Sequence, residues 1–275
     1  MRNSIRLYWW SEIHIQKKKK ENYGDLLGKY LVEKISRKSV KWVRANKFHL
    51  KNLWKPLYVT IGSVLEHIGP RCTVWGSGIN HRDSVISNAT FLAVRGPLSR
   101  KRLLSMGYSC PEVYGDPALL LPLFFENTFA KKTKIGVIPH INDYVAVAQM
   151  FANIPEVKVI DFRTNDIEST TKEILSCERI IASSLHGVIV AHAYQIPAVQ
   201  VIFSNKIFGD GVKYHDYFMS VGLDPYRALT VDTPEDVNHW ISFVENHKNA
   251  LPDIGLIESL QKKLLEVCPF KALNQ

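Results

Sequence analysis

Four residues at a strand-to-helix junction carry the strongest chemical signal in the chain. Ser183-Ser184-Leu185-His186 joins an apolar segment to one with helical character. In an open parallel sheet, ligands bind beyond the carboxyl ends of the strands, and the free N–H groups of a following helix favour an anion. Ser183, Ser184 and Leu185 are therefore predicted to bind an anionic group, with His186 beside it as a titratable group. The alternative is that His186 is a hydrogen-bonded, partly buried structural residue.

Other ionisable side chains are also predicted at strand ends. Arg95 follows the apolar run Phe91–Val94, and its guanidinium offers a fork of donors suited to phosphate or carboxylate. It could instead pair with a nearby carboxylate such as Asp116, which could equally be a turn former. His140 follows the strand Ile135–Ile138 and could place a second imidazole in the same cleft, or serve only the fold.

Polar and small residues elsewhere suit the binding of a second ligand. Asn22 and Asp25 open a helix and could line a cleft, although both are also favoured as helix caps. The turn Gly76-Ser77-Gly78 follows a strand and would let a ligand approach the backbone closely, as many glycine turns do without binding anything. Tyr214 lies in a segment rich in glycine, charge and aromatic rings, which suits a sugar and equally suits a core; Lys213 and Asp216 there could form a surface ion pair.

The elements that must position these residues alternate along the chain. Apolar runs alternate with amphipathic ones, a pattern typical of an α/β protein with parallel sheets. We predict strands in each half of the chain, at Ile5–Trp10, Val40–Val43, Leu57–Ile61, Cys72–Trp75, Phe91–Val94, Ile135–Ile138, Val157–Ile160, Arg179–Ala182 and Ala198–Phe203. Two Rossmann-like domains facing each other across a cleft are the simplest architecture, with boundaries at 1–128 and 129–250 and a C-terminal helix in 251–275 that packs back on the first domain.

Charge and composition narrow the possible partners. The 275 residues carry a net charge of +9, and residues 1–55 alone hold 15 basic against 4 acidic side chains, including Lys17–Lys20. Such a basic region attracts an anionic membrane surface or a diphosphate, or it is only a solvated face; nucleic acid is disfavoured because no binding motif accompanies it.

Cysteine spacing and hydropathy indicate whether to expect a metal site, a disulfide framework or a membrane span. The four scattered cysteines suggest neither a zinc site nor a disulfide framework, so we expect no metal. No apolar run reaches the length of a membrane span and no signal peptide is evident, so we expect a cytoplasmic protein, with peripheral contact at the inner face of the cytoplasmic membrane through residues 1–55.

Taken in order, these motifs resemble the polysaccharide pyruvyltransferase family. The similarity spans about residues 20–222 and rests on Asn22-Tyr23-Gly24-Asp25-Leu26, Gly76-Ser77-Gly78, Val94-Arg95-Gly96-Pro97, Tyr114-Gly115-Asp116-Pro117-Ala118, Ile138-Pro139-His140, Ser183-Ser184-Leu185-His186-Gly187, Ala193-Tyr194-Gln195-Ile196-Pro197 and Lys213-Tyr214-His215-Asp216-Tyr217.

The resemblance implies two Rossmann-like domains arranged as in a GT-B glycosyltransferase. It also implies transfer of the enolpyruvyl unit of phosphoenolpyruvate to a sugar as a cyclic ketal, with the donor near Arg95 and the Leu185-His186 turn and no further cofactor. His186 would protonate the donor, and His140 or Asp116 would serve as the base. Several family members have an arginine where this chain has Ser184, so its role would pass to hydroxyls, backbone amides or another base such as Lys213.

Acceptors of such enzymes are commonly saccharides, in bacteria often carried on a polyprenyl diphosphate during capsular or exopolysaccharide synthesis. The basic N-terminal region fits that setting. Two other readings stay open. One is a GT-B glycosyltransferase that uses a nucleotide sugar, since fold does not determine chemistry. The other is a non-enzymatic membrane-surface or saccharide-binding module.

Overall fold

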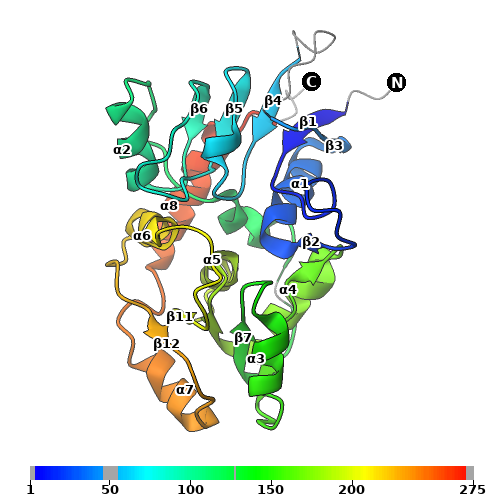
Figure 1. Ribbon diagram of the computed structural model, residues 1–275, viewed down its shortest axis with the longest axis vertical. Helices are drawn as coiled ribbons and strands as arrows, with labels where there is room; N and C mark the ends of the chain where they lie inside the picture. Colours follow the sequence, from blue (N-terminus) through cyan, green and yellow to red (C-terminus); the bar gives the residue numbers. More distant parts are fainter. Residues whose placement is uncertain (1–3, 46–54, 127, 271–275) are drawn as a thin grey trace.

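Two parallel sheets organise the chain (Figure 1). The computed structural model describes residues 4–45, 55–126 and 128–270. The first five-stranded sheet has the order β3-β1-β4-β5-β6, formed by β1 (Ile5–Tyr8), β3 (Val40–Trp42), β4 (Leu57–Val59), β5 (Cys72–Trp75) and β6 (Thr90–Ala93). The second has the order β12-β11-β10-β7-β8, formed by β7 (Thr133–Ile138), β8 (Val157–Val159), β10 (Cys177–Ala182), β11 (Ala198–Ile202) and β12 (Leu229–Thr230). This is the α/β architecture of two Rossmann-like domains, as predicted.

Helices connect the parallel strands and cover the sheets. The connections are α1 (Tyr23–Ser36), η2 (Leu65–His67), α2 (Pro97–Ser105), η3 (Pro117–Leu123), α3 (Tyr144–Met150), α4 (Ile167–Leu175), α5 (Leu185–Ala193), α6 (Val212–Ser220) and α7 (Val237–Glu245), followed by α8 (Ile254–Glu266). Helices on both faces bury the strands from both sides, which explains why the strands read as continuous apolar runs. Ile180, Ile181 and Ala182 of β10, for example, are fully buried.

Helix α6 is the longest element that was not predicted from the sequence. The segment around Tyr214 was interpreted only as a ligand-binding or core stretch, yet residues 212–220 form a regular helix between the two sheets (Figure 1). Gly211 begins it with a φ of 84°, a left-handed conformation that glycine adopts without strain. The helix presents Lys213 and Tyr214 to one side and buries Asp216, so the surface pair of Lys213 and Asp216, one of the two alternatives for this segment, does not form.

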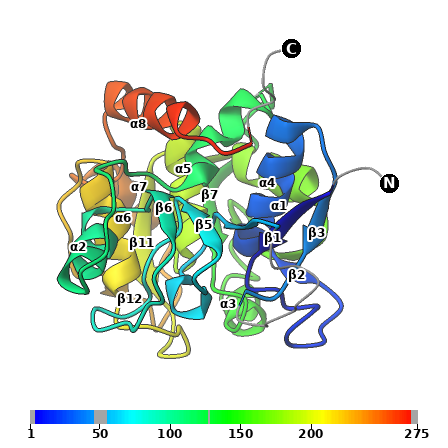
Figure 2. The same ribbon diagram turned by 90° about the horizontal axis from the view of Figure 1, so that it is seen from above.

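Two further contacts join the halves of the chain. The short strand β2 (Glu21–Asn22) pairs antiparallel with β9 (Arg163–Thr164) of the second half. Helix α8 returns to the first sheet, where the Trp75 indole donates a hydrogen bond of 3.0 Å to the carbonyl of Leu264. Seen from above, α8 in red lies along the outside of the molecule, and the chain that follows it runs toward α1 (Figure 2). The domain boundaries themselves stay a prediction.

Three features of composition also have a structural counterpart. All four cysteines are buried free thiols. No helix within the described residues is both long and apolar enough to cross a bilayer. The lysines of the run 17–20 are exposed, whereas Lys47 and Lys51 of the basic region lie outside the described residues.

Candidate active site

A cavity of about 490 Å³ lies between the two halves of the chain. Its walls are the loops that follow β1, β4 and β5 in the first half and β7, β10 and β11 in the second, together with the start of α1 and of α6. Carboxyl ends of parallel strands meet at one edge of each sheet, so the two sheets direct their ligand-binding edges at each other. Of the residues predicted to form the site, the cavity is lined by Asn22, Asp25, His140, Ser184, Leu185, His186, Lys213 and Tyr214.

His186 and Asp116 form the central ionisable pair. The Nε2 atom of His186 lies 3.5 Å from Oδ2 of Asp116, and both atoms are buried with no hydrogen-bond partner among the described residues. The other carboxylate oxygen of Asp116 accepts a 2.9 Å bond from the N–H of Ala118 and so caps η3. Asp116 does not itself line the cavity. It lies behind the imidazole, with Oδ2 facing Nε2 at a distance longer than an ordinary hydrogen bond.

Gly24 determines where the imidazole of His186 lies. A Cβ atom placed on Gly24 would come within 2.1 Å of Nδ1 of His186, so a larger residue would displace the ring. Asn22 holds this end of α1 by accepting a 3.0 Å hydrogen bond from the N–H of Gly24. Asn22 is therefore a helix cap, the alternative considered for it, and it also lines the cavity.

The turn before α5 presents hydrogen-bond donors to the cavity. Within the described ranges, the N–H groups of Leu185 and His186 have no acceptor, and Ser184 forms no side-chain capping bond. Ser183 is buried instead, and its Oγ accepts a 2.9 Å bond from the N–H of His140. Tyr214 donates a 2.6 Å hydrogen bond to the carbonyl of Ser183. Ser183 and Tyr214 thus shape the turn, while Ser184, Leu185 and His186 line the cavity.

Burial shifts the pKa of three side chains around the cavity. Desolvation, reinforced by the charge of Lys213, lowers the pKa of His140 to about 4. Desolvation also lowers the pKa of Lys213 to about 8, with a further lowering by Arg95. For Asp25, desolvation raises the pKa to about 7, against the opposing charge of His186. Shifts of this size mark groups whose charge is easily changed by a ligand.

The tautomer of His140 follows from its own loop. Its Nδ1 accepts a 3.3 Å hydrogen bond from the N–H of Asn142, so a neutral imidazole carries its hydrogen on Nε2. His140 is therefore a hydrogen-bond donor to a ligand at neutral pH rather than a free base.

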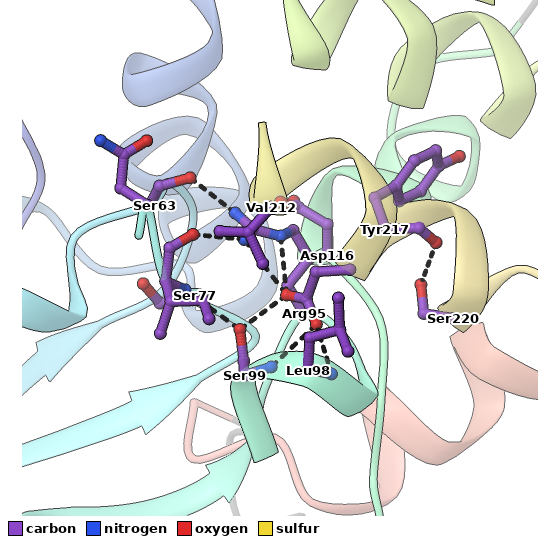
Figure 3. Close-up of polar contacts among 12 residues, drawn as sticks. Ser63, Ser77, Arg95, Leu98, Ser99, Asp116, Val212, Tyr217 and Ser220 are labelled. Atoms are coloured by element: carbon purple, nitrogen blue, oxygen red, sulfur yellow. Dashed lines mark hydrogen bonds and ion pairs between the residues drawn. The ribbon is translucent and has the colours of Figure 1, made fainter. Parts of the chain in front are cut away.

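Arg95 is buried and bound to protein groups. Its side chain is 1% exposed and Asp216, on α6, is 0% exposed. The guanidinium donates to Oδ2 of Asp216 at 3.1 Å, to Oγ of Ser63 at 2.7 Å and to the carbonyl of Ile79 at 2.7 Å. Figure 3 shows Ser63, Ser77 and Ser99 gathered around Arg95. The residue does not line the cavity.

The partner of Arg95 was not the one considered from the sequence. A nearby carboxylate such as Asp116 was the expected alternative, whereas the structure brings in Asp216 from 121 residues away. Asp216 also accepts hydrogen bonds of 2.9 Å from the N–H groups of Leu98 and Ser99 at the start of α2. The pair thus fastens α6 to the first sheet and places Lys213 at the cavity.

The small residues 76–78 support this buried pair and do not line the cavity. Ser77 donates a 2.7 Å hydrogen bond to the carbonyl of Gly62. A Cβ on Gly78 would lie 2.4 Å from Cζ of Arg95, and a Cβ on Gly76 would lie 2.3 Å from Pro117. Close packing around Arg95 and Pro117, rather than approach to a ligand, accounts for both glycines.

Several cavity residues were missed by sequence reasoning. They are Trp10, Glu12, Gly62, Ser63, Val64, Glu66, His67, Asn80, His81, Ile141 and Phe208. Most of them follow a predicted strand within a few residues, so the strand-end rule that singled out His186 could have found them. No group of three or more His, Cys, Asp or Glu residues able to hold a metal ion occurs among the residues that the structure describes.

Comparison with known proteins gives two matches. Residues 22–205 match the model of the family described as polysaccharide pyruvyl transferase. An uncharacterized protein of Acanthamoeba polyphaga mimivirus is 28% identical over 251 residues, covering 89% of this chain and 86% of that protein.

Proposed function

Because the chain belongs to the polysaccharide pyruvyl transferase family, we propose that it transfers the pyruvyl unit of phosphoenolpyruvate to two hydroxyls of one sugar as a cyclic ketal. One observation carries the choice of donor. His140, His186 and Lys213 gather on the same wall of the cavity as the free N–H groups at the start of α5. Phosphoenolpyruvate presents a phosphate and a carboxylate, and this wall offers cations and donors for both.

The donor phosphate binds at the start of α5. Family members with an arginine before the Leu-His pair would place a guanidinium there, and this chain has Ser184. Lys213 replaces that charge, because it lines the same cavity. Arg95 acts through Lys213: its pair with Asp216 holds α6, and with it Lys213, in place.

His186 is the general acid. Its protonated imidazole gives a proton to the methylene carbon of phosphoenolpyruvate, which leaves a cationic centre at C2 with oxocarbenium character. Asp116 stabilises the imidazolium form and keeps Nε2 turned away from the donor. A sugar hydroxyl then attacks C2, phosphate departs with its C–O bond electrons, and a second hydroxyl of the same sugar closes the ketal.

Asp25 is the base in this scheme. A carboxylate that titrates near neutral pH is matched to taking a proton from an attacking hydroxyl. This role replaces the one expected for Asp116 or His140, because Asp116 faces His186 and Nδ1 of His140 is occupied. Of the two hydroxyl protons, one replaces the proton that His186 gave to carbon and the other leaves with inorganic phosphate.

Donor binding and turnover test the proposal. Phosphoenolpyruvate should raise the melting temperature, whereas nucleotide sugars such as UDP-glucose should not. His186→Ala should still bind phosphoenolpyruvate but should lose phosphate release in the presence of an acceptor. Stabilisation by the nucleotide sugar alone would favour a glycosyltransferase, and near-wild-type transfer by His186→Ala would eliminate the acid assignment.

We also propose that the acceptor is a saccharide carried on a polyprenyl diphosphate, in capsular or exopolysaccharide synthesis at a membrane surface. A second cavity of about 320 Å³ supports this proposal. It is lined by the basic residues Lys18, Lys19, Lys20 and Arg163 and by Glu21 and Asp161, and it shares Glu12 and Ile141 with the main cavity. Asp161 pairs with Arg163, which leaves Lys19 and Lys20 as the cations for a diphosphate. Reversing the charges of Lys17–Lys20 should weaken use of a lipid-linked acceptor more than of a short unlinked one. Equal effects on both would remove the lysines from substrate handling.

A further inference from the structure

Charge is divided between the two walls of the main cavity. The lining residues of the second half include His140, His186 and Lys213 and no Asp or Glu. Those of the first half include Glu12, Asp25 and Glu66, together with His67 and His81, and among the described residues no Lys or Arg. An anionic donor on the basic wall leaves the opposite wall to the acceptor. That wall disfavours a second anion, because like charges in a partly dehydrated site repel strongly.

The carboxylate of Glu66 is held in place through one of its two oxygens. Its Oε1 accepts a 3.1 Å hydrogen bond from the N–H of Asn80 and a second bond from the hydroxyl of Ser84. Within the described residues no protein group bonds to Oε2, although the residue lines the cavity. A carboxylate oxygen held in this way accepts hydroxyl groups of a sugar at little cost in side-chain entropy.

An aromatic surface lies beside this carboxylate. The rings of Trp10 and His67 stand 5.1 Å apart at their centres, and both residues line the cavity. Burial lowers the pKa of His67, which favours the uncharged imidazole. An indole face packs well against the C–H face of a pyranose ring, whose hydroxyls then point toward neighbouring polar groups. Glu12 is not free for this purpose, because its carboxylate is paired with Lys18.

We propose that Trp10, Glu66 and His67 form the acceptor subsite and that it takes an uncharged pyranose ring, rejecting uronates and phosphorylated rings. The proposal rests on the proposed function, since it supposes that the basic wall holds the anionic donor. Trp10 stacks on the ring and Oε2 of Glu66 accepts its hydroxyl protons. Glu66 is therefore a specificity-determining residue, because it repels a ring carboxylate placed at the same position.

Binding of paired monosaccharides tests the subsite. The probes are the methyl pyranosides of glucose, galactose and mannose and the methyl glycosides of the three corresponding uronic acids, which carry a free carboxylate. Saturation-transfer NMR is the readout, and phosphoenolpyruvate is present. At least one neutral pyranoside should bind, and its uronate should bind at least about tenfold more weakly. Trp10→Ala should weaken the neutral ring by at least about tenfold, with Trp10→Phe intermediate.

Glu66→Gln is the decisive variant. Glutamine keeps an oxygen for Asn80 and Ser84 but removes the charge, so the preference for the neutral ring should shrink toward unity. Val85→Ala, an exposed apolar side chain outside the cavity, should change nothing. A uronate bound as well as its neutral partner, a preference unchanged in Glu66→Gln, or binding of no probe by a protein that binds phosphoenolpyruvate would each overturn the subsite.

Binding of phosphoenolpyruvate is measured in a separate experiment, so a failure of the acceptor subsite can be distinguished from a failure of the proposed function. A protein that binds neutral rings through Trp10 but shows no shift in melting temperature with phosphoenolpyruvate keeps the subsite and loses the proposed function. Melting temperatures of Trp10→Ala and Trp10→Phe show whether either variant has unfolded. If Trp10→Ala has, Trp10→Phe and Glu66→Gln still decide the question.

Discussion

His186 and Asp116 come from opposite halves of the chain, and Nε2 of the first lies 3.5 Å from Oδ2 of the second. The carboxylate belongs to the cap of η3 and the imidazole to the start of α5. The separation is longer than an ordinary hydrogen bond, and such contacts commonly tighten when substrate binds. A closing movement of the two halves would therefore act directly on this pair.

Asp116→Asn should test what the carboxylate contributes to His186 without disturbing the fold. Asparagine retains the oxygen that caps η3 but removes the charge that stabilises the imidazolium form. We expect kcat for pyruvyl transfer to fall by about 10²-fold or more, with little change in the KM for phosphoenolpyruvate. Steady-state phosphate release measures both constants, and a kcat within threefold of wild type would remove Asp116 from the mechanism.

Gly24→Ala should lower activity without unfolding the protein. The added methyl group would overlap His186, because its position lies 2.1 Å from Nδ1. In the first turn of α1, however, alanine is a better helix former than glycine by up to about 1 kcal/mol. Transfer rate and melting temperature should be compared with those of Gly107→Ala, where a new Cβ meets nothing. The position has a φ of 79°, so that control tests backbone strain alone. If Gly24→Ala were fully active, the imidazole would not depend on this contact.

The raised pKa of Asp25 predicts opposite effects of pH on activity and stability. As a base, the carboxylate should give kcat/KM an ascending limb centred near pH 7, which Asp25→Asn abolishes. For stability, a pKa raised from 3.8 to about 7 means that the free energy of unfolding declines as pH rises through this window. Below pH 3.8 both states are protonated and no difference remains.

Asp25→Asn removes that decline. The variant should therefore gain stability relative to the wild type between about pH 4 and pH 8. Urea denaturation at both pH values measures the difference. An equal difference at the two values would mean that the carboxyl titrates alike in the folded and unfolded chains.

Lys213 predicts a pH dependence for donor binding. Its pKa of about 8 means that the ammonium loses its proton as pH rises through this value, so phosphoenolpyruvate should bind more weakly above pH 8 than at pH 7. Lys213→Arg keeps a charge to far higher pH, and its affinity should stay level over the same range. Isothermal titration with phosphoenolpyruvate distinguishes the two. A wild-type affinity that is flat across pH 8 would exclude Lys213 as a phosphate ligand.

The buried pair of Arg95 and Asp216 should dominate the stability of the contact between α6 and the first sheet. Asp216→Asn leaves a buried guanidinium without its counter-charge, which typically costs about 3–5 kcal/mol. Asp224→Asn breaks the exposed pair with Lys248 and should cost about 1 kcal/mol or less. Denaturant unfolding of both variants provides the comparison. Similar losses in the two would show that α6 is held by its apolar contacts instead.

Local patterns were enough to predict the sheets and one wall of the cavity. Runs such as Ile135–Ile138 and Arg179–Ala182 read as buried parallel strands, and the residues just beyond them, His140 and Ser184–His186, line the cavity. That inference needed no knowledge of distant parts of the chain, because a strand delivers its next residues to the sheet edge whatever its neighbours are. Of the missed residues, Glu66 follows the predicted strand Leu57–Ile61 within a few residues, and Trp10 lies beyond the true end of β1 at Tyr8.

What the tertiary structure alone decided is which charges meet. The sequence determined that Arg95, Asp116 and Asp216 follow or flank apolar elements. It did not determine whether Arg95 pairs with the carboxylate 21 residues away or with the one 121 residues away. Burial determines the partner, because a guanidinium removed from water needs a counter-charge and pairs with the carboxylate that packing places beside it. That choice turned Arg95 from an expected phosphate ligand into the support of α6, and it left Asp116 to His186.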